Sequence, residues 1–323
     1  MLGIAKGPRT GTSSRVPPNA PMNLLKANGI DLAYDSFGNP SDDVVLLISG
    51  LGTQMIRWTQ AFCEALAARG YRVIRFDNRD AGCSTHFRDC VPPDFGALAA
   101  ALMAGQRPEL PYTLHDMAAD AIGLMDALGI DRAHVAGRSM GGMIAQVMAS
   151  EYPSRVLSLT SIMSSSGNPG LPQAAPEVMG MMMRPVPNPV SDQEGFLTHS
   201  VAFARHIGST GFPFDEESHR RLVLEEARRA YDPGGTGRQI AAMAVAGDRR
   251  ARLATIKAPA LVIHGAADPL IPAACGRDTA DSIPDARFML IEGMGHDLPP
   301  ALYEQVATAI DDLAGECQRS EMS

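Results

Sequence analysis

The chain has 323 residues, of which 45% are hydrophobic and 20% charged, and its formal net charge is −8. These proportions are those of an ordinary globular protein and exclude a disordered or fibrous chain, while the length suits one large domain with an insertion. The negative charge and the lack of a run rich in lysine and arginine make nucleic acid an unexpected partner, because a polyphosphate backbone binds basic patches.

The first segment, residues 1–21, is predicted to be a flexible leader. It carries positive charges but no continuous apolar segment of the kind that signal peptides have. No stretch of the chain reaches the ~20 apolar residues of a membrane span. The five cysteines are an odd number without a CxxC pair, which disfavours a disulfide framework and a zinc site. We therefore expect a cytoplasmic protein.

Strand-like and helical segments alternate after the leader. Ile30, Leu32 and Tyr34 alternate with polar residues, which predicts a half-exposed antiparallel strand. Segments with helical spacing separate short apolar runs, and each run is predicted to be a strand buried on both faces. This alternation predicts a mostly parallel sheet with helices on both faces, whose ligands bind at the carboxyl ends of the strands. The apolar runs lie at 44–48, 73–74, 133–136, 156–162, 261–263 and 288–291.

The alternation stops between residues 167 and 247. Prolines crowd the first part of this segment and helix-like polar stretches follow, which predicts a helical cap inserted between two strands. The predicted core therefore comprises 22–166 and 248–315, and 316–323 form a tail. A methionine-rich patch in the cap has two interpretations, core packing or an adaptable apolar pocket, since methionine suits both. The candidate pocket residues are Met179, Met182 and Met183.

A candidate nucleophile follows the strand predicted at 133–136. The sequence there is Gly137-Arg138-Ser139-Met140-Gly141, and residues of helical character come next. This is the G-x-S-x-G pattern in the strand-turn-helix context that a nucleophilic serine requires. Gly137 and Gly141 are needed because side chains there would collide with the backbone around the strained turn at Ser139. The N-terminus of the following helix favours a developing oxyanion.

A serine hydroxyl needs a base and a group that orients the base. Asp268 lies just past the predicted strand at 261–263, and His296 lies in a glycine-containing loop after the strand at 288–291. Taken singly, Asp268 could be a turn former and His296 a surface residue, but their order after Ser139 favours a catalytic triad. His264 is expected to brace the loop of the acid. Competing candidates for the acid, which do not share its position, are Asp126, Asp278, Asp281 and Asp297.

These motifs, with the segment from Phe76 to Ser84, resemble the α/β-hydrolase family from about residue 22 to 315. The G-x-S-M-G elbow and the R-D-x-G-x-S loop are most similar to lid-bearing esterases that include the aclacinomycin methylesterases. The resemblance implies an α/β-hydrolase fold with an inserted helical cap, and carboxylic-ester hydrolysis through an acyl-enzyme. It implies an oxyanion hole made by the backbone N–H groups of Leu51 and Met140. Ser49 departs from the pattern, because many members have histidine there.

The resemblance also places the loop at 77–80 beside the oxyanion loop, as a structural turn with a buried ion pair. We expect a serine carboxylesterase for small or medium acyl chains that needs no cofactor or metal ion. A lactonase, an acyltransferase or a perhydrolase could use the same triad, because pocket shape selects the acceptor. The alternative from another class is a non-catalytic receptor or scaffold with this fold. The expected partner is a small-molecule ester, and the sequence does not fix its identity or the oligomeric state.

Overall fold

The computed structural model describes residues 23–321, with side chains up to residue 317, so the predicted leader lies outside the described part. One eight-stranded sheet runs through the molecule in the order β1-β2-β4-β3-β5-β6-β7-β8. Its strands are β1 (Asn23–Ala27), β2 (Ile30–Phe37), β3 (Asp43–Ile48), β4 (Tyr71–Phe76), β5 (Ala133–Arg138), β6 (Val156–Ile162), β7 (Ala260–Gly265) and β8 (Arg287–Ile291).

The strands β3 to β8 pair in parallel, while β1 and β2 are antiparallel to their neighbours. The prediction of a mostly parallel sheet is therefore confirmed, and every predicted apolar run falls within a strand. The prediction that all these runs are buried on both faces is wrong for β8, where Leu290 is 45% exposed. The reason is that β8 is the last strand of the sheet and the C-terminal helix packs against β6 and β7 instead.

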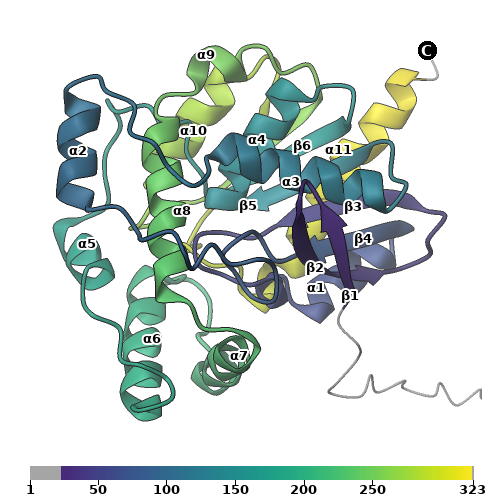
Figure 1. The fold of residues 1–323 in the computed structure, drawn as a ribbon. Helices are drawn as coiled ribbons and strands as arrows, with labels where there is room; N and C mark the ends of the chain where they lie inside the picture. Colours follow the sequence, from purple (N-terminus) through teal and green to yellow (C-terminus); the bar gives the residue numbers. More distant parts are fainter. Residues whose placement is uncertain (1–22, 322–323) are drawn as a thin grey trace, which may run out of the picture.

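Helices cover both faces of the sheet (Figure 1). One layer contains α3 (Leu114–Ala127), α4 (Met140–Glu151) and α10 (Ala273–Ser282). The other contains α1 (Gln60–Ala67) and α11 (Tyr303–Glu321), which follow the short 3-10 helices η1 (Met55–Arg57) and η2 (Pro300–Leu302). Because α11 continues to Glu321, the predicted tail at 316–323 begins inside a helix.

Helices α5 (Pro176–Met182), α6 (Gln193–Ile207), α7 (Glu216–Arg229), α8 (Pro233–Ala246) and α9 (Arg250–Leu253) lie between β6 and β7. Figure 1 shows α5, α6 and α7 on one side of the molecule, away from the sheet, with α8 running from them toward it. Helix α2 (Phe95–Met103), which the sequence analysis does not predict, lies on the same side. Helices α5 to α8 occupy the segment predicted to be the cap, and we keep the name cap for 167–247.

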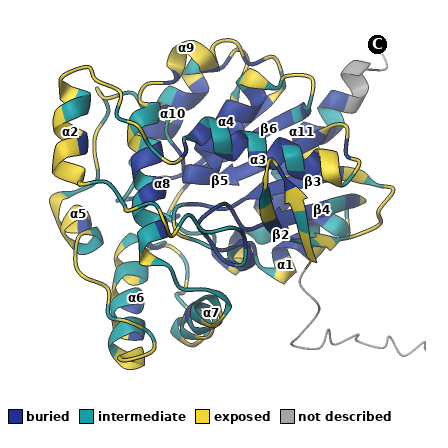
Figure 2. Ribbon diagram, in the orientation of Figure 1, coloured by how far each residue is buried: buried dark blue, intermediate teal, exposed yellow. Residues whose placement is uncertain are grey.

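Two hydrophobic clusters enclose the sheet, one beneath α3 and α4 and the other beneath α1 and α11. Figure 2 shows the buried residues in the strands and in the helix faces turned toward them. Burial of each large apolar side chain contributes about 1.5–3 kcal/mol, so this core holds the strands firmly. The loops at their carboxyl ends consequently have fixed starting points.

Candidate active site

The turn between β5 and α4 holds Ser139 in a strained conformation, with φ 55° and ψ −124°. Both neighbouring glycines are required by close contacts. A Cβ atom at Gly137 would lie 2.1 Å from the Gly141 carbonyl oxygen, and one at Gly141 would lie 2.2 Å from the Ile48 carbonyl oxygen. The turn therefore projects the serine side chain at the carboxyl edge of the sheet, where α4 begins.

His296 lies between this serine and an aspartate. Its Nε2 atom is 3.0 Å from Ser139 Oγ, and its Nδ1 atom is 2.7 Å from Asp268 Oδ2. A carboxylate only accepts hydrogen bonds, so Nδ1 carries the proton and Nε2 accepts from the serine hydroxyl. Asp268 Oδ1 accepts the N–H groups of Leu270 and Ile271, each at 2.9 Å. The plane of the carboxylate is thus fixed by its own turn.

His264 reinforces the turn of this acid from β7. Its Nε2 donates to the Ile271 carbonyl oxygen at 2.8 Å and lies 3.6 Å from Asp268 Oδ2. Burial lowers the pKa of His264, which favours the neutral ring. The opposite edge of the ring faces Gly276, where a Cβ atom would lie 2.2 Å from Nδ1. These contacts match the brace that the sequence analysis expects.

The competing aspartates are exposed to solvent or have carboxylates that accept hydrogen bonds from residues other than His296. Asp281 is exposed on α10. Asp297 adjoins the histidine, but its carboxylate accepts the N–H and hydroxyl groups of Ser209. The structure therefore brings Asp268, and none of these, to the imidazole of His296. The partners of the remaining two are Arg155 for Asp126, and Ser166 and Asn168 for Asp278.

The loop after β3, which we call the oxyanion loop (residues 49–53), lies against the candidate nucleophile Ser139. A Cβ atom at Gly50 would lie 3.2 Å from Ser139 Cβ. The predicted donors come from this loop and from the first residue of α4. Within residues 23–321, neither the Leu51 N–H nor the Met140 N–H donates a hydrogen bond to the protein. Both groups are thus available to an oxygen beside the serine.

Two residues to which the sequence analysis gives no role hold the oxyanion loop. Asn78 Nδ2 donates to the Ser49 carbonyl oxygen at 2.9 Å, and the Gly52 N–H donates to Gln239 Oε1 at 2.8 Å. Ser49, which replaces the family's histidine, is fully buried and donates weakly to the Gln54 carbonyl oxygen at 3.4 Å. The family-like segment at 76–84 pointed toward Asn78, whereas no motif marks Gln239.

Comparison with known proteins identifies the fold family. Residues 43–188 match the family described as the α/β hydrolase fold. Rhodomycin D methylesterase DauP of Streptomyces sp. strain C5 is 33% identical over 309 residues, covering 90% of this chain and 97% of that protein. This chain belongs to the α/β-hydrolase fold family. Rhodomycin D methylesterase DnrP of Streptomyces peucetius is 32% identical over 309 residues, covering 90% of this hydrolase and 97% of that protein.

Solved structures agree with this assignment. The enol-lactonase from Burkholderia xenovorans LB400 superposes with a TM-score of 0.64 at 23% identity, covering 90% of the hydrolase and 99% of that chain. The thermophilic esterase from Thermogutta terrifontis gives 0.63 at 22% identity, with 92% and 99% covered. At these identities the likeness establishes the fold, and the predicted fold class is confirmed. Among the described residues of the hydrolase, no helix combines the length and the apolar character that crossing a membrane requires.

Buried ion pairs join the loop after β4 to other elements of the hydrolase. The predicted turn at 77–80 contains three charged residues, which pair outward and not with one another. Burial raises the pKa of Asp77 even though Arg229 opposes the change. Two of the three partners lie in the cap, so this loop is a point of attachment for it. The pairs are Asp77–Arg229 on α7, Arg79–Asp120 on α3 and Asp80–Arg238 on α8, at 2.5, 2.6 and 2.7 Å.

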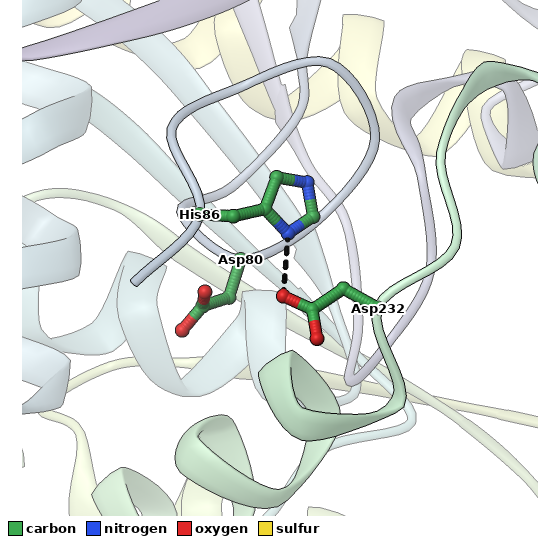
Figure 3. A group of neighbouring side chains, drawn as sticks. All are labelled: Asp80, His86 and Asp232. Atoms are coloured by element: carbon green, nitrogen blue, oxygen red, sulfur yellow. Dashed lines mark hydrogen bonds and ion pairs between the residues drawn. The ribbon is translucent and has the colours of Figure 1, made fainter. Parts of the chain in front are cut away.

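Three potential metal ligands, Asp80, His86 and Asp232, lie within 4.8 Å of one another at this attachment (Figure 3). Their oxygens are already engaged, since Arg238 donates to Asp80 at 2.7 Å and to Asp232 at 3.0 Å, and Tyr112 donates to Asp80 at 2.6 Å. Burial alone would raise the pKa of Asp80, but the hydrogen bonds from Arg238 and Tyr112 outweigh it and lower the pKa. The contacts are those of an ion-pair network built around a guanidinium.

The candidate pocket residues lie on α5 and at the residue that follows its last turn. Met179 is 45% exposed and Met183 is 68% exposed, while Met182 is half-buried. Figure 2 shows α5 with exposed residues on the side of the molecule that also carries α2. Two of the three side chains therefore present apolar surface to solvent, which does not fit the interpretation that they fill a core.

Proposed function

We propose that this α/β hydrolase is a serine carboxylesterase in which Ser139, His296 and Asp268 form the catalytic triad. The observation that carries the proposal is the continuous hydrogen-bond chain from the serine hydroxyl through both imidazole nitrogens to the carboxylate. The relatives named as methylesterases support carboxylic-ester cleavage independently of this geometry.

In the proposed reaction, Ser139 Oγ attacks the ester carbonyl carbon while His296 Nε2 takes the hydroxyl proton. The carbonyl oxygen becomes an oxyanion and accepts hydrogen bonds from the Leu51 and Met140 N–H groups. The imidazolium, stabilised by the Asp268 carboxylate, then protonates the departing alcohol and leaves an acyl-enzyme. Water, deprotonated by the same histidine, attacks the acyl carbon, and collapse of the second tetrahedral intermediate releases the acid and restores the serine.

The proposal extends to the setting of this reaction. The substrate is a small-molecule ester of short or medium acyl chain, and its approach is lined by three methionines of the cap at 167–247, the exposed Met179 and Met183 and the half-buried Met182. Apolar, unbranched side chains of this kind adapt to varied ligands. A cytoplasmic location fits the state of the five cysteines, all of which lie in the described part and are thiols.

The test measures hydrolysis of p-nitrophenyl esters across an acyl-chain series, with lactone and amide substrates alongside. Ser139→Ala should fold normally and lose about 10⁵-fold or more in kcat, because catalysis by the rest of the site is all that remains. A fluorophosphonate probe should label the wild-type protein and not this variant. Activity within tenfold of wild type in the variant would end the assignment of the nucleophile, and preferred turnover of lactones would replace the esterase with a lactonase.

A further inference from the structure

The oxyanion loop is held by a residue that reaches it from the cap. Gln239 lies on α8 and is fully buried, 187 positions away from the glycine it contacts. Its Oε1 atom accepts the Gly52 N–H at 2.8 Å, and its Nε2 atom donates to the Arg79 carbonyl oxygen at 2.8 Å. Since a carbonyl oxygen only accepts, the Arg79 contact fixes which end of the amide faces the loop.

The amide itself is tied to the core. The peptide that accepts from Gln239 belongs to Arg79, whose guanidinium pairs with Asp120 of α3 at 2.6 Å. The neighbouring Arg238 pairs with Asp80 at 2.7 Å, so this part of α8 is attached at two successive residues. Gln239 is therefore a rigid connection between the core and the oxyanion loop.

Leu51 lies between two anchored peptide groups. The Leu51 N–H belongs to the same peptide group as the Gly50 carbonyl. This carbonyl oxygen accepts hydrogen bonds from Thr53 Oγ1 at 3.0 Å and from the Thr53 N–H at 3.3 Å. The following peptide, which contains the Gly52 N–H, is the one that Gln239 holds. Gly52 has φ +62°, and a Cβ atom there would lie 2.8 Å from Thr236 Oγ1 on α8. The cap helix thus defines one side of the turn that aims the Leu51 N–H.

We propose that Gln239 is a positioning residue of the oxyanion hole, through which the cap sets the direction of the Leu51 N–H. The inference rests on the proposed esterase function. Without the amide, the Gly52 N–H would lose the acceptor that fixes its peptide group, and because Gly52 itself is exposed, the turn would be free to shift toward water. An oxyanion donor acts only when charge develops on the substrate oxygen, so its displacement weakens transition-state binding and leaves substrate binding almost unchanged.

The experiment compares Gln239→Leu with Gln54→Leu. Gln54 is a matched control, because it is also a buried glutamine that joins core to cap, through the Glu226 carbonyl at 2.8 Å and the Ala230 carbonyl at 3.2 Å. In Gln239→Leu, kcat should fall about 10- to 100-fold with KM changed less than about threefold. Affinity for a trifluoromethyl ketone, whose adduct places an oxyanion in the hole, should fall by the same factor as kcat/KM. Gln54→Leu should lower the melting temperature and leave kcat within about threefold.

A second variant, Gln239→Glu, keeps an acceptor for the Gly52 N–H, while it replaces the donor to the Arg79 carbonyl with a second oxygen and adds a negative charge. Its kcat should stay within about tenfold of wild type, and if the leucine variant does not fold, a loss larger than this in Gln239→Glu overturns the inference. The inference is overturned by wild-type kcat in folded Gln239→Leu, by equal kcat losses in both glutamine-to-leucine variants, or by a larger loss in Gln239→Glu. If Ser139→Ala instead retained ester turnover, the proposed function itself would fail, whatever the result at Gln239.

Discussion

The acid of the proposed triad and the oxyanion loop are held in place by different parts of the molecule. Asp268 is oriented by peptide groups two and three residues further along its own turn, and His264 braces that turn from the strand before it. The oxyanion loop is held by Asn78 after β4 and, at Gly52, by a glutamine of the cap 187 positions away. Proton transfer is therefore organised by local core structure, whereas stabilisation of the oxyanion depends on correct docking of the cap.

The largest effect on the core side of this comparison is expected from Asp268→Asn. The amide keeps the shape of the side chain but removes its charge and can stabilise the wrong tautomer of His296. We expect kcat to fall by about 10³- to 10⁴-fold with little change in KM, measured by ester hydrolysis. Asp297→Asn is the control, and it should cost far less, because the Asp297 carboxylate binds Ser209. A variant with near-normal kcat at position 268, in a folded protein, would assign the acid elsewhere.

On the cap side, the next effect is expected from Arg238→Met. This change removes the cation that pairs with Asp80 at 2.7 Å, where both side chains are almost fully buried. An unpaired buried carboxylate is left behind, so the free energy of unfolding should fall by about 3 kcal/mol in urea titrations. The matched control is Arg250→Met, whose partner Asp248 lies at 2.7 Å on the surface. Its effect should stay within about 0.5 kcal/mol, and equal losses in the two variants would contradict a buried attachment of the cap.

The smallest effect concerns acid sensitivity within the cap. Burial between α6 and α7 lowers the pKa of His219 to about 4, with the charge of Arg57 acting in the same direction. The unfolded chain takes up this proton near pH 6.5, before the folded protein does, so stability is lost as the pH falls from about 6.5 to 4. Urea titrations at pH 7 and pH 4.5 should show that the free energy of unfolding falls by about 1–2 kcal/mol less between these pH values in His219→Gln than in the wild-type protein.

The exposed His206 of α6 provides the control for this measurement. Its replacement by glutamine should leave the difference in unfolding free energy between the two pH values unchanged. An identical pH dependence in His219→Gln and the wild-type protein would show that the acid sensitivity arises outside the α6–α7 contact.

Local sequence was enough to predict the residues that the structure brings together at the sheet edge. Ser139, Asp268 and His296 each follow a strand that its apolar run reveals, and parallel strands end at a common edge. The same logic failed where position depends on distant packing. The exposure of β8 follows from its place at the end of the sheet, and the strand β1 is defined by pairing with β2.

Gln239 illustrates the limit of motif-based reasoning. A polar residue in a helix of small side chains is ordinarily a solvent-facing position, and nothing in the residues from Pro233 to Ala246 marks one glutamine as buried. Only the folded chain brings its amide to the oxyanion loop. Helix α2, which the sequence analysis does not predict, likewise contacts α8 far along the chain, and Glu316 in the extension of α11 pairs with Arg287.

The contact between Gln239 and Gly52 also limits how such an enzyme can be altered by recombination. Inserted caps are the natural segment to exchange when a new substrate is sought, because they shape the binding pocket. In this protein a transplanted cap would bring a new pocket and remove the acceptor of the Gly52 N–H at the same time. Chimeras that keep a glutamine at the position of Gln239 should therefore retain turnover, while those without it should bind new esters and cleave them slowly.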